Sequence, residues 1–190
     1  MRDSEQRTYT IEELISAIRQ NRNIAGIRQI ILGIKDINQA DNDGRTALYW
    51  AARLNNIEMV RELIAHGADV NQVTNDGKTA LYVAASSRNN LEMVRELIAL
   101  GADVRQVTND GKTALQQAAR WNNLEVVREL IAHGADVHQV SDDGSTALYE
   151  AAVSNRIEMV MELIANRADV NPADHDGRTA LVWAALHNNL

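Results

Sequence analysis

Residues 76–85 read Asp-Gly-Lys-Thr-Ala-Leu-Tyr-Val-Ala-Ala, and this stretch decides the fold because its pattern returns along the chain. The phrase Asp-Gly-x-Thr-Ala-Leu recurs at intervals of 33, 34, 33 and 33 residues, with its glycine at Gly44, Gly77, Gly111, Gly144 and Gly177. A second phrase, Gly-Ala-Asp-Val, recurs in step at Gly67, Gly101 and Gly134, and Arg167 stands at the fourth such position. A fixed period of this length indicates a linear array of one supersecondary unit.

Each unit is expected to contain a turn followed by two short helices. Asp76-Gly77 is a turn signal, and the hydroxyl of Thr79 can cap a first helix over 80–85. Apolar residues at positions 91, 94, 97 and 98 share one face of a second helix, and Gly101 follows it, where a left-handed C-cap favours glycine. The one extra residue of this unit lies within 84–90, between the two helices, where an insertion costs little.

These phrases together resemble the ankyrin repeat, whose pattern appears here as Asp-Gly-x-Thr-Ala-Leu-x-x-Ala-Ala followed by Leu-Ile-Ala-x-Gly-Ala-Asp-Val-Asn. The resemblance covers roughly residues 42–190, with a more divergent match before them. It implies an all-α solenoid of stacked antiparallel helix pairs, with β-turn fingers at about right angles and a concave groove formed by the fingers and first helices. It also implies that the protein binds other proteins, usually without catalysis.

The chain departs from the family pattern at several positions. Alanine replaces the family's proline at the start of each first helix, and because alanine is the best helix former the fold should survive. Arg167 replaces a C-cap glycine, which costs on the order of 1 kcal/mol if the left-handed geometry is kept. Arg105 and His138 stand where Asn71 and Asn171 sit in the motif, so single repeats are weakened but the assignment is not.

The repeat register divides the chain into a short leader and one array over residues 10–190. We expect residues 1–9 to be disordered and residues 10–41 to form a divergent capping repeat with a polar outer side. Four complete repeats follow, at 42–74, 75–108, 109–141 and 142–174. The last unit, 175–190, has no second helix, which predicts an exposed face over Leu181, Ala184 and Ala185. Either the chain is a fragment of a longer protein, or this face pairs with something.

Composition argues against several classes of function. The 190 residues include 19 Lys+Arg and 26 Asp+Glu, giving a net charge of −7 and a pI near 5.2, with the basic residues scattered singly. We therefore expect neither nucleic acid nor an anionic membrane as a partner. The absence of cysteine excludes disulfides, thiolate metal sites and cysteine nucleophiles. A charged N-terminal stretch and the lack of a long apolar segment favour a cytoplasmic location.

Nothing in the sequence forms a constellation for catalysis or metal binding. The five histidines do not pair on one helix face beside a carboxylate, at His66, His133, His138, His175 and His187. Residues 41–44, Asp-Asn-Asp-Gly, lack the alternating ligands and closing glutamate of a calcium loop and are interpreted as turn chemistry. We therefore expect no metal, no cofactor and no enzymatic activity.

A partner-binding surface is instead expected where residues vary between repeats. One position of the first helix should face the groove, and it holds Trp50, Val83, Gln117, Glu150 and Trp183. Further candidates come from the helix ends and the fingers, at Arg53, Arg120 and Trp121 and at Arg45, Lys78 and Lys112. All three tryptophans fall at such positions, and exposed Trp and Arg are frequent anchors of protein interfaces. The first candidates are Trp50, Arg53, Arg120 and Trp121; the alternative is that the tryptophans pack against adjacent repeats.

Two other repeated sets are interpreted as structural. The tyrosines that replace the family's buried histidine are expected to pack inside the array, at Tyr49, Tyr82 and Tyr149. Charges such as Glu58, Arg61 and Glu62 repeat almost unchanged on the second helices, which predicts a solvated face with weak i, i+3 pairs.

The leading hypothesis is a non-catalytic module that binds a partner protein, of unknown identity, through its groove and fingers. The alternative is the targeting or substrate-recruiting portion of a larger enzyme, adaptor or secreted effector. A third is a purely structural or engineered stack, which the irregular insertion and Arg167 disfavour. We expect a monomer, with dimerisation through the uncovered last helix as the other possibility.

Overall fold

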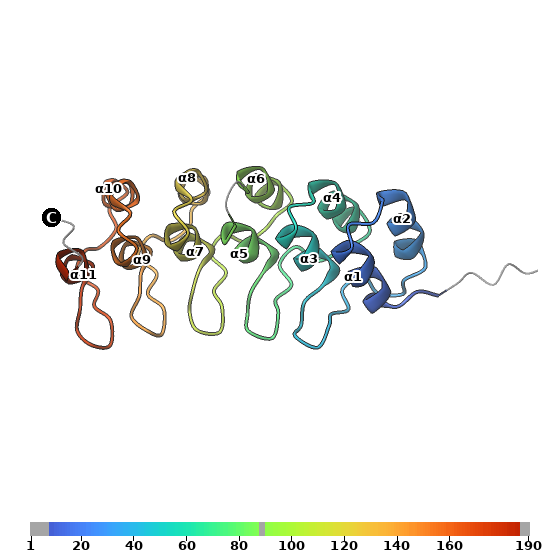
Figure 1. Ribbon diagram of the computed structural model, residues 1–190, viewed down its shortest axis with the longest axis horizontal. Helices are drawn as coiled ribbons and strands as arrows, with labels where there is room; N and C mark the ends of the chain where they lie inside the picture. Colours follow the sequence, from blue (N-terminus) through green and yellow to red (C-terminus); the bar gives the residue numbers. More distant parts are fainter. Residues whose placement is uncertain (1–7, 88–89, 187–190) are drawn as a thin grey trace, which may run out of the picture.

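The computed structural model describes residues 8–87 and 90–186, and in this part the chain forms one elongated stack of helices (Figure 1). The helices of the described residues are α1 (Ile11–Arg19), α2 (Ile24–Leu32), α3 (Ala47–Arg53), α4 (Ile57–Ala65), α5 (Ala80–Ala85), α6 (Leu91–Ala99), α7 (Ala114–Arg120), α8 (Leu124–Ala132), α9 (Ala147–Val153), α10 (Ile157–Ala165) and α11 (Ala180–Leu186). The same residues contain isolated β-bridges but no β-strand. The predicted all-α repeat solenoid is confirmed.

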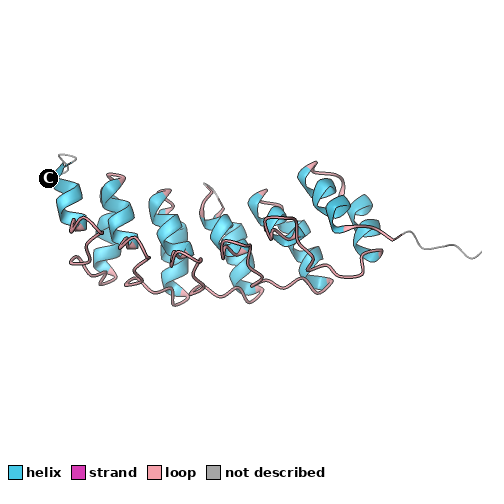
Figure 2. Ribbon diagram, turned by 90° about the horizontal axis from the view of Figure 1, so that it is seen from below, coloured by secondary structure: helices cyan, strands magenta, loops and turns pink. Residues whose placement is uncertain are grey.

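The helices lie in two rows. The odd-numbered helices form an inner row, in which α3, α5, α7, α9 and α11 each pack against the next, and the even-numbered helices form an outer row (Figure 1). Long loops project from the inner row on the side away from the outer helices, and they are the predicted fingers. Figure 2 shows the same array turned by 90°, with the helices of successive units standing side by side along its length. The inner row and the fingers together therefore bound one long face.

Side-chain caps and small residues explain why the inner helices are short and closely packed. Thr79 caps α5 by accepting a hydrogen bond from the backbone N–H of Tyr82, and the corresponding caps of α3, α7 and α9 are Thr46, Thr113 and Thr146. Ala51 and Ala52 of α3 are fully buried, because the neighbouring inner helices approach closely over their small side chains. Outer helices such as α4 bury one apolar face, consisting of Met59, Val60 and Leu63.

Left-handed residues follow the outer helices α4, α6, α8 and α10, at the positions that the repeat pattern predicts. Gly67, Gly101 and Gly134 have φ angles of 89°, 94° and 88° at the ends of α4, α6 and α8. Arg167 keeps the same conformation after α10, with φ of 66°, although its side chain disfavours it. The array thus holds its geometry at the one repeat that lacks the glycine.

Backbone hydrogen bonds join each of the first three fingers to the next. The backbone N–H of Asn109 donates to the carbonyl of Asp76 at 3.1 Å, and the Asn109 side-chain amide donates to the carbonyl of Asn75 at 2.9 Å. Gly77 has φ of 81°, and a Cβ atom there would lie 2.6 Å from the backbone nitrogen of Asn109. Glycine is therefore required at this turn both by backbone conformation and by the close approach of the neighbouring finger.

Ion pairs on the outer row run between repeats, so the predicted i, i+3 pairing is wrong. Each arginine reaches the glutamate of the following outer helix, at N–O distances of 2.9, 2.6, 2.8 and 2.7 Å, in the pairs Arg28–Glu62, Arg61–Glu96, Arg95–Glu129 and Arg128–Glu162. Three of these glutamates also have a partner on their own repeat, because Glu62 and Glu129 lie 3.8 and 3.7 Å from His66 and His133, and Glu162 accepts from Asn166 at 3.1 Å. We call the four Arg–Glu pairs the outer ladder; Met161 occupies the next arginine position.

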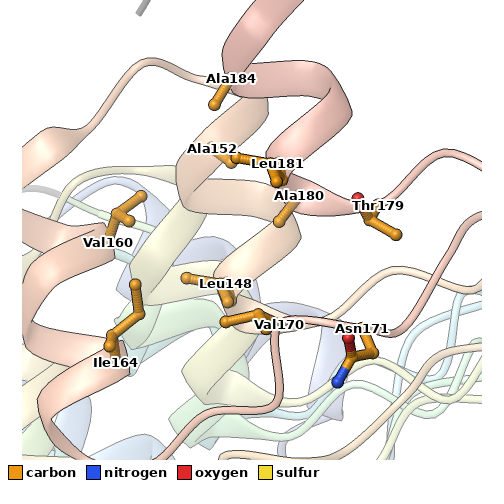
Figure 3. A pocket seen from close by; sticks show the side chains of 10 residues that line it. All are labelled: Leu148, Ala152, Val160, Ile164, Val170, Asn171, Thr179, Ala180, Leu181 and Ala184. Carbon is orange, nitrogen blue, oxygen red and sulfur yellow. The ribbon is translucent and has the colours of Figure 1, made fainter. Parts of the chain in front are cut away.

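The two ends of the described array differ in their surroundings. At the first, the backbone N–H of Tyr9 donates to the carbonyl of Gly33 at 3.2 Å, which ties this residue to the capping unit. The rest of the predicted disordered leader, residues 1–7, lies outside the described residues. At the other end Leu181 of α11 is 65% exposed, beside an apolar hollow of 340 Å³ formed by α9, α10 and α11 (Figure 3).

Candidate partner-binding groove

Trp50 lies at the groove but is also part of the packing. Its indole N–H donates to Asp41 Oδ2 at 3.3 Å, and its ring meets Tyr49 edge to face at a centroid distance of 5.8 Å. The side chain is half-buried and packs against the core. Arg19 of the adjacent capping unit also lies over this indole, so the packing alternative is met in part, and the contact role of Trp50 stays a prediction.

Three guanidinium groups surround the Trp50 indole. The guanidinium carbons of Arg19, Arg45 and Arg53 lie 4.7, 5.5 and 5.8 Å from its ring centroid, within reach of cation–π attraction. Arg45 also pairs with Asp43 at 2.9 Å. Arg19 and Arg53 are exposed, and neither makes an ion pair with any other residue that the structure describes. Two cations without an ion-pair partner therefore lie at the indole, next to the single carboxylate of Asp41.

Trp183 repeats this arrangement on α11. Its indole N–H donates to Asp174 Oδ2 at 3.1 Å, its ring lies edge to face with Tyr149 at 6.2 Å, and Arg178 stands 5.2 Å from the ring centroid. The helix ends that place Arg19 and Arg53 near Trp50 carry Val153 and Leu186 here. The two sites therefore share an aspartate, a tyrosine and a finger arginine, but only the first has the additional pair of arginines.

Trp121 differs from the other two tryptophans. It follows the last residue of α7 and is 47% exposed, and its indole N–H donates to Gln117 Oε1 of the same helix at 3.3 Å. Arg120 beside it is exposed as well. This pair presents an aromatic ring and a guanidinium to solvent in the middle of the array.

Other predicted positions are less available to a partner. Val83 is only 7% exposed, which corrects the expectation that it offers contact area. Its short side chain belongs to the core because α5 is packed between α3 and α7. Gln117 is half-buried. On the fingers, Lys78 pairs with Asp76 at 2.6 Å and lies 5.9 Å from the ring centroid of Tyr82.

Lys112 links two fingers and borders an unusual carboxylate. Its ammonium lies 3.6 Å from Asp110 and 3.1 Å from Asp143 on the next finger. Burial works against the charged form of Asp143, but hydrogen bonds from Ser141 and Ser145 hold its pKa below the usual range. Burial raises the pKa of Glu150 on α9, while Arg120 and Lys112 act in the opposite direction and Asp143 adds repulsion. Glu150 is thus a half-buried carboxylate with incomplete compensation.

Two shallow hollows mark the middle of this face. The first, of 330 Å³, includes Tyr82, Lys112 and Arg120 in its lining, and the second, of 290 Å³, includes Glu150 together with Lys112 and Arg120. Both are open and lined by charged side chains rather than by an enclosed apolar wall. This shape suits the side chains of a macromolecule lying along the array better than a small buried ligand.

A family model described as ankyrin repeats, in three copies, matches residues 14–108, 74–141 and 133–190. The chain belongs to the ankyrin repeat family. Ankyrin repeats are protein–protein interaction modules, and their fold is typically non-catalytic. A search of the curated proteins gives no match.

Two further features are absent from the described residues of this ankyrin array. Among these residues, none of the helices is both long enough and apolar enough to cross a membrane. Within the same ranges, no group of three or more His, Cys, Asp or Glu side chains is placed to hold a metal ion. Of the histidines considered above, His187 lies outside the described residues.

Three residues that shape the groove of this ankyrin array are not among the predicted site residues. Asp41 and Asp174 hold the two indoles and Arg19 lies over one of them, but the sequence indicates only a turn for Asp41 and predicts no binding role for the other two. A signal for the aspartates does exist within the chain. Where the first residue of a finger is aspartate, the residue nine positions later is tryptophan. The other three fingers begin with threonine or serine, and the residue nine positions later is smaller or polar, in the pairs Thr74 and Val83, Thr108 and Gln117, and Ser141 and Glu150.

Proposed function

We propose that this ankyrin array binds a partner protein along the face formed by its fingers and inner helices, without catalysis of its own. The observation that carries the proposal is a difference between the two faces. On the outer row, the arginines of α2, α4, α6 and α8 are all paired with glutamates in the outer ladder. On the groove face, Arg53, Arg120 and Trp121 are exposed, and neither arginine makes an ion pair with another described residue.

Trp121 and Arg120 form the strongest pair of anchors at the centre of this surface. A partner that covers the exposed indole removes apolar area from water, and buried Trp and Arg anchors each contribute about 2 kcal/mol or more to binding. Trp50 serves less well as a test position, because its ring also packs against the core. Truncating it would confuse lost binding with lost stability.

Partner capture with a double variant, Arg120→Ala and Trp121→Ala, tests the proposal. The matched control is Glu92→Ala, which removes an exposed side chain from the outer helix α6. We expect the double variant to lose at least tenfold in affinity for a partner that the parent chain captures, while the control binds as the parent does. Equal capture by all three proteins, each shown to be folded by circular dichroism, would reject this face.

A second candidate function is recruitment on behalf of a larger enzyme, adaptor or secreted effector. The exposed apolar side of α11 supports it, because ankyrin units usually cover such a face with further structure. Reading the coding frame beyond residue 190 tests this candidate, and an immediate stop codon would remove it. In either case we propose that the array works in the cytoplasm, as a monomer in the absence of its partner.

A further inference from the structure

We propose that the cluster of Arg19, Trp50 and Arg53 is the docking point for an acidic segment of the partner, a stretch of extended polypeptide that presents Asp or Glu carboxylates. We call these three residues the arginine–indole cluster. The inference rests on the proposed function, because it assigns the chemistry of the partner at one end of the same groove.

The geometry of the cluster prepares it for an anion. Arg19 ends α1 and Arg53 ends α3, so stacking of the first two units brings both guanidinium groups to one indole, at 4.7 and 5.8 Å from its centroid. Cation–π contact restricts two otherwise flexible side chains without using their N–H donors. The planar donor fork of each guanidinium then remains open to a carboxylate, and less side-chain entropy is lost when one binds.

Charge balance around the indole favours a carboxylate over a phosphate. Three guanidinium groups, with Arg45 as the third, face the two carboxylates Asp41 and Asp43. Arg45 forms an ion pair with Asp43. Asp41 accepts hydrogen bonds from the Trp50 indole N–H and from the backbone N–H groups of Asp43 and Arg45. The surplus is one positive charge, which a single carboxylate neutralises and a dianionic phosphate would exceed.

The rest of the groove restricts where an acidic segment can lie. At the matching Trp183 site, Val153 and Leu186 stand at the helix ends in place of Arg19 and Arg53, so neither arginine has a counterpart at these two positions. Between the two sites, the cations Lys112 and Arg120 lie beside the carboxylates Asp110, Asp143 and Glu150, so this face carries no surplus of positive charge to attract an acidic chain. The acidic part of a partner is therefore directed to α1 and α3, and the protein contains its own matched control in Trp183.

The three indole N–H groups allow a direct test by nuclear magnetic resonance. The full chain, labelled with ¹⁵N, is titrated with acetyl-hexaglutamate amide, and acetyl-hexalysine amide serves as the opposite-charge probe. We expect hexaglutamate to shift the Trp50 indole signal while those of Trp121 and Trp183 stay in place, and we expect hexalysine to leave Trp50 unmoved. Because the contact is electrostatic, the apparent affinity should fall several-fold between about 50 and 200 mM salt.

Variants separate this site from non-specific attraction. Arg19→Gln with Arg53→Gln should lower the affinity for hexaglutamate at least tenfold. Arg95→Gln, which removes an exposed guanidinium from the outer helix α6, away from the groove, should leave the Trp50 response intact. An equal hexaglutamate shift at Trp183, or an unchanged affinity in the Arg19/Arg53 variant, would overturn the proposal.

A third probe decides between the two anion chemistries. The peptide is acetyl-hexaserine amide with one phosphoserine, and it should bind the cluster more weakly than hexaglutamate; tighter binding would reject the carboxylate assignment. The hexaglutamate titration and the partner-capture experiment can fail independently, so failure of this inference is distinguishable from failure of the proposed function. If partner capture depends on Arg120 and Trp121 while hexaglutamate leaves Trp50 unmoved, the groove stands and the acidic-segment inference fails.

Discussion

At the scale of single residues, Glu150 is a carboxylate that the fold does not favour. Burial raises its pKa, so its folded value lies above the ordinary 4.5 and the charged form destabilises the folded state. The protonated Glu150 carboxyl therefore contributes fully to the stability of the folded state below the ordinary pKa, and this contribution is lost as the pH rises through the pKa of the folded state. Retaining such a group on the groove face is consistent with a role in contact rather than in stability.

Glu150→Gln should stabilise the protein at neutral pH, because it removes the half-buried charge while keeping the side-chain shape. We expect the melting temperature to rise by about 2 °C at pH 7, the size of change that under 1 kcal/mol produces in a chain of this length. Thermal melts at pH 7 and at pH 4 measure the effect. The gain should shrink at pH 4, where the parent carboxyl is mostly protonated; a gain that is equal at both pH values would exclude charge as its cause.

Arg167 is the other residue at which the chain bears a local cost. It adopts φ of 66° where three other repeats place glycine, and a side chain with a Cβ disfavours this region. Arg167→Gly should therefore increase the free energy of unfolding by about 1 kcal/mol, measured by urea denaturation. A neutral or destabilising result would show that the arginine side chain makes contacts that offset its backbone strain.

At the scale of elements, the finger turns and the helix ends both use glycine, but for different reasons. Gly77 combines a positive φ with the close approach of Asn109, whereas Gly101 has φ of 94° and nothing within 4 Å of an added Cβ. Gly101→Ala should cost about 1–2 kcal/mol from backbone strain alone. Gly77→Ala should cost clearly more, because the finger–finger hydrogen bonds must also shift. Equal losses in urea denaturation would contradict the importance of the close approach.

The helices themselves could be predicted from the sequence because their determinants are local. Thr79, the apolar spacing of the second helix and Gly101 act within a single unit, and the observed α5 and α6 agree with the expected ranges. The outer ladder could not be predicted in this way. Its partners are separated by 34 or 35 residues and become neighbours only after the units stack, with a register that no single repeat contains.

The candidate groove shows the same limit. The repeat comparison placed the tryptophans and arginines on one face, but it could not tell that Val83 would be buried, since that depends on how closely α3 and α7 flank α5. Nor could it bring Arg19 to Trp50, because this contact crosses from the capping unit to the next one. Side-chain identity indicated the surface, and inter-repeat geometry determines which of its residues are available.

At the scale of the whole molecule, the outer ladder makes stability depend on pH. The pKa values of Glu62, Glu96 and Glu162 are lowered by hydrogen bonds from Arg28, Arg61 and Arg128 respectively. A lowered folded pKa means that the stabilisation is present above the ordinary value of 4.5 and is lost as the pH falls through the folded value.

Acidification from pH 5 to pH 3 should therefore lower the melting temperature, and Arg61→Gln with Arg128→Gln should make that fall smaller. The double variant should also melt a few degrees below the parent at pH 6, a gap that should narrow in about 1 M salt because exposed pairs are screened. Scanning calorimetry at these conditions measures both effects. Parallel curves for parent and variant across this pH range would show that the ladder does not govern acid sensitivity.

The ladder has a fixed direction, since each arginine extends forward to the glutamate of the unit that follows. The outer helix of an interior unit therefore supplies a glutamate to the arginine of the unit before it and an arginine to the glutamate of the unit after it. In-frame duplication or deletion of such a unit in the gene would leave no arginine or glutamate of the outer ladder unpaired, so the number of units can change without further substitutions at the contacts between them. Met161 breaks this rule, and a unit inserted after it would inherit a methionine in place of the expected cation.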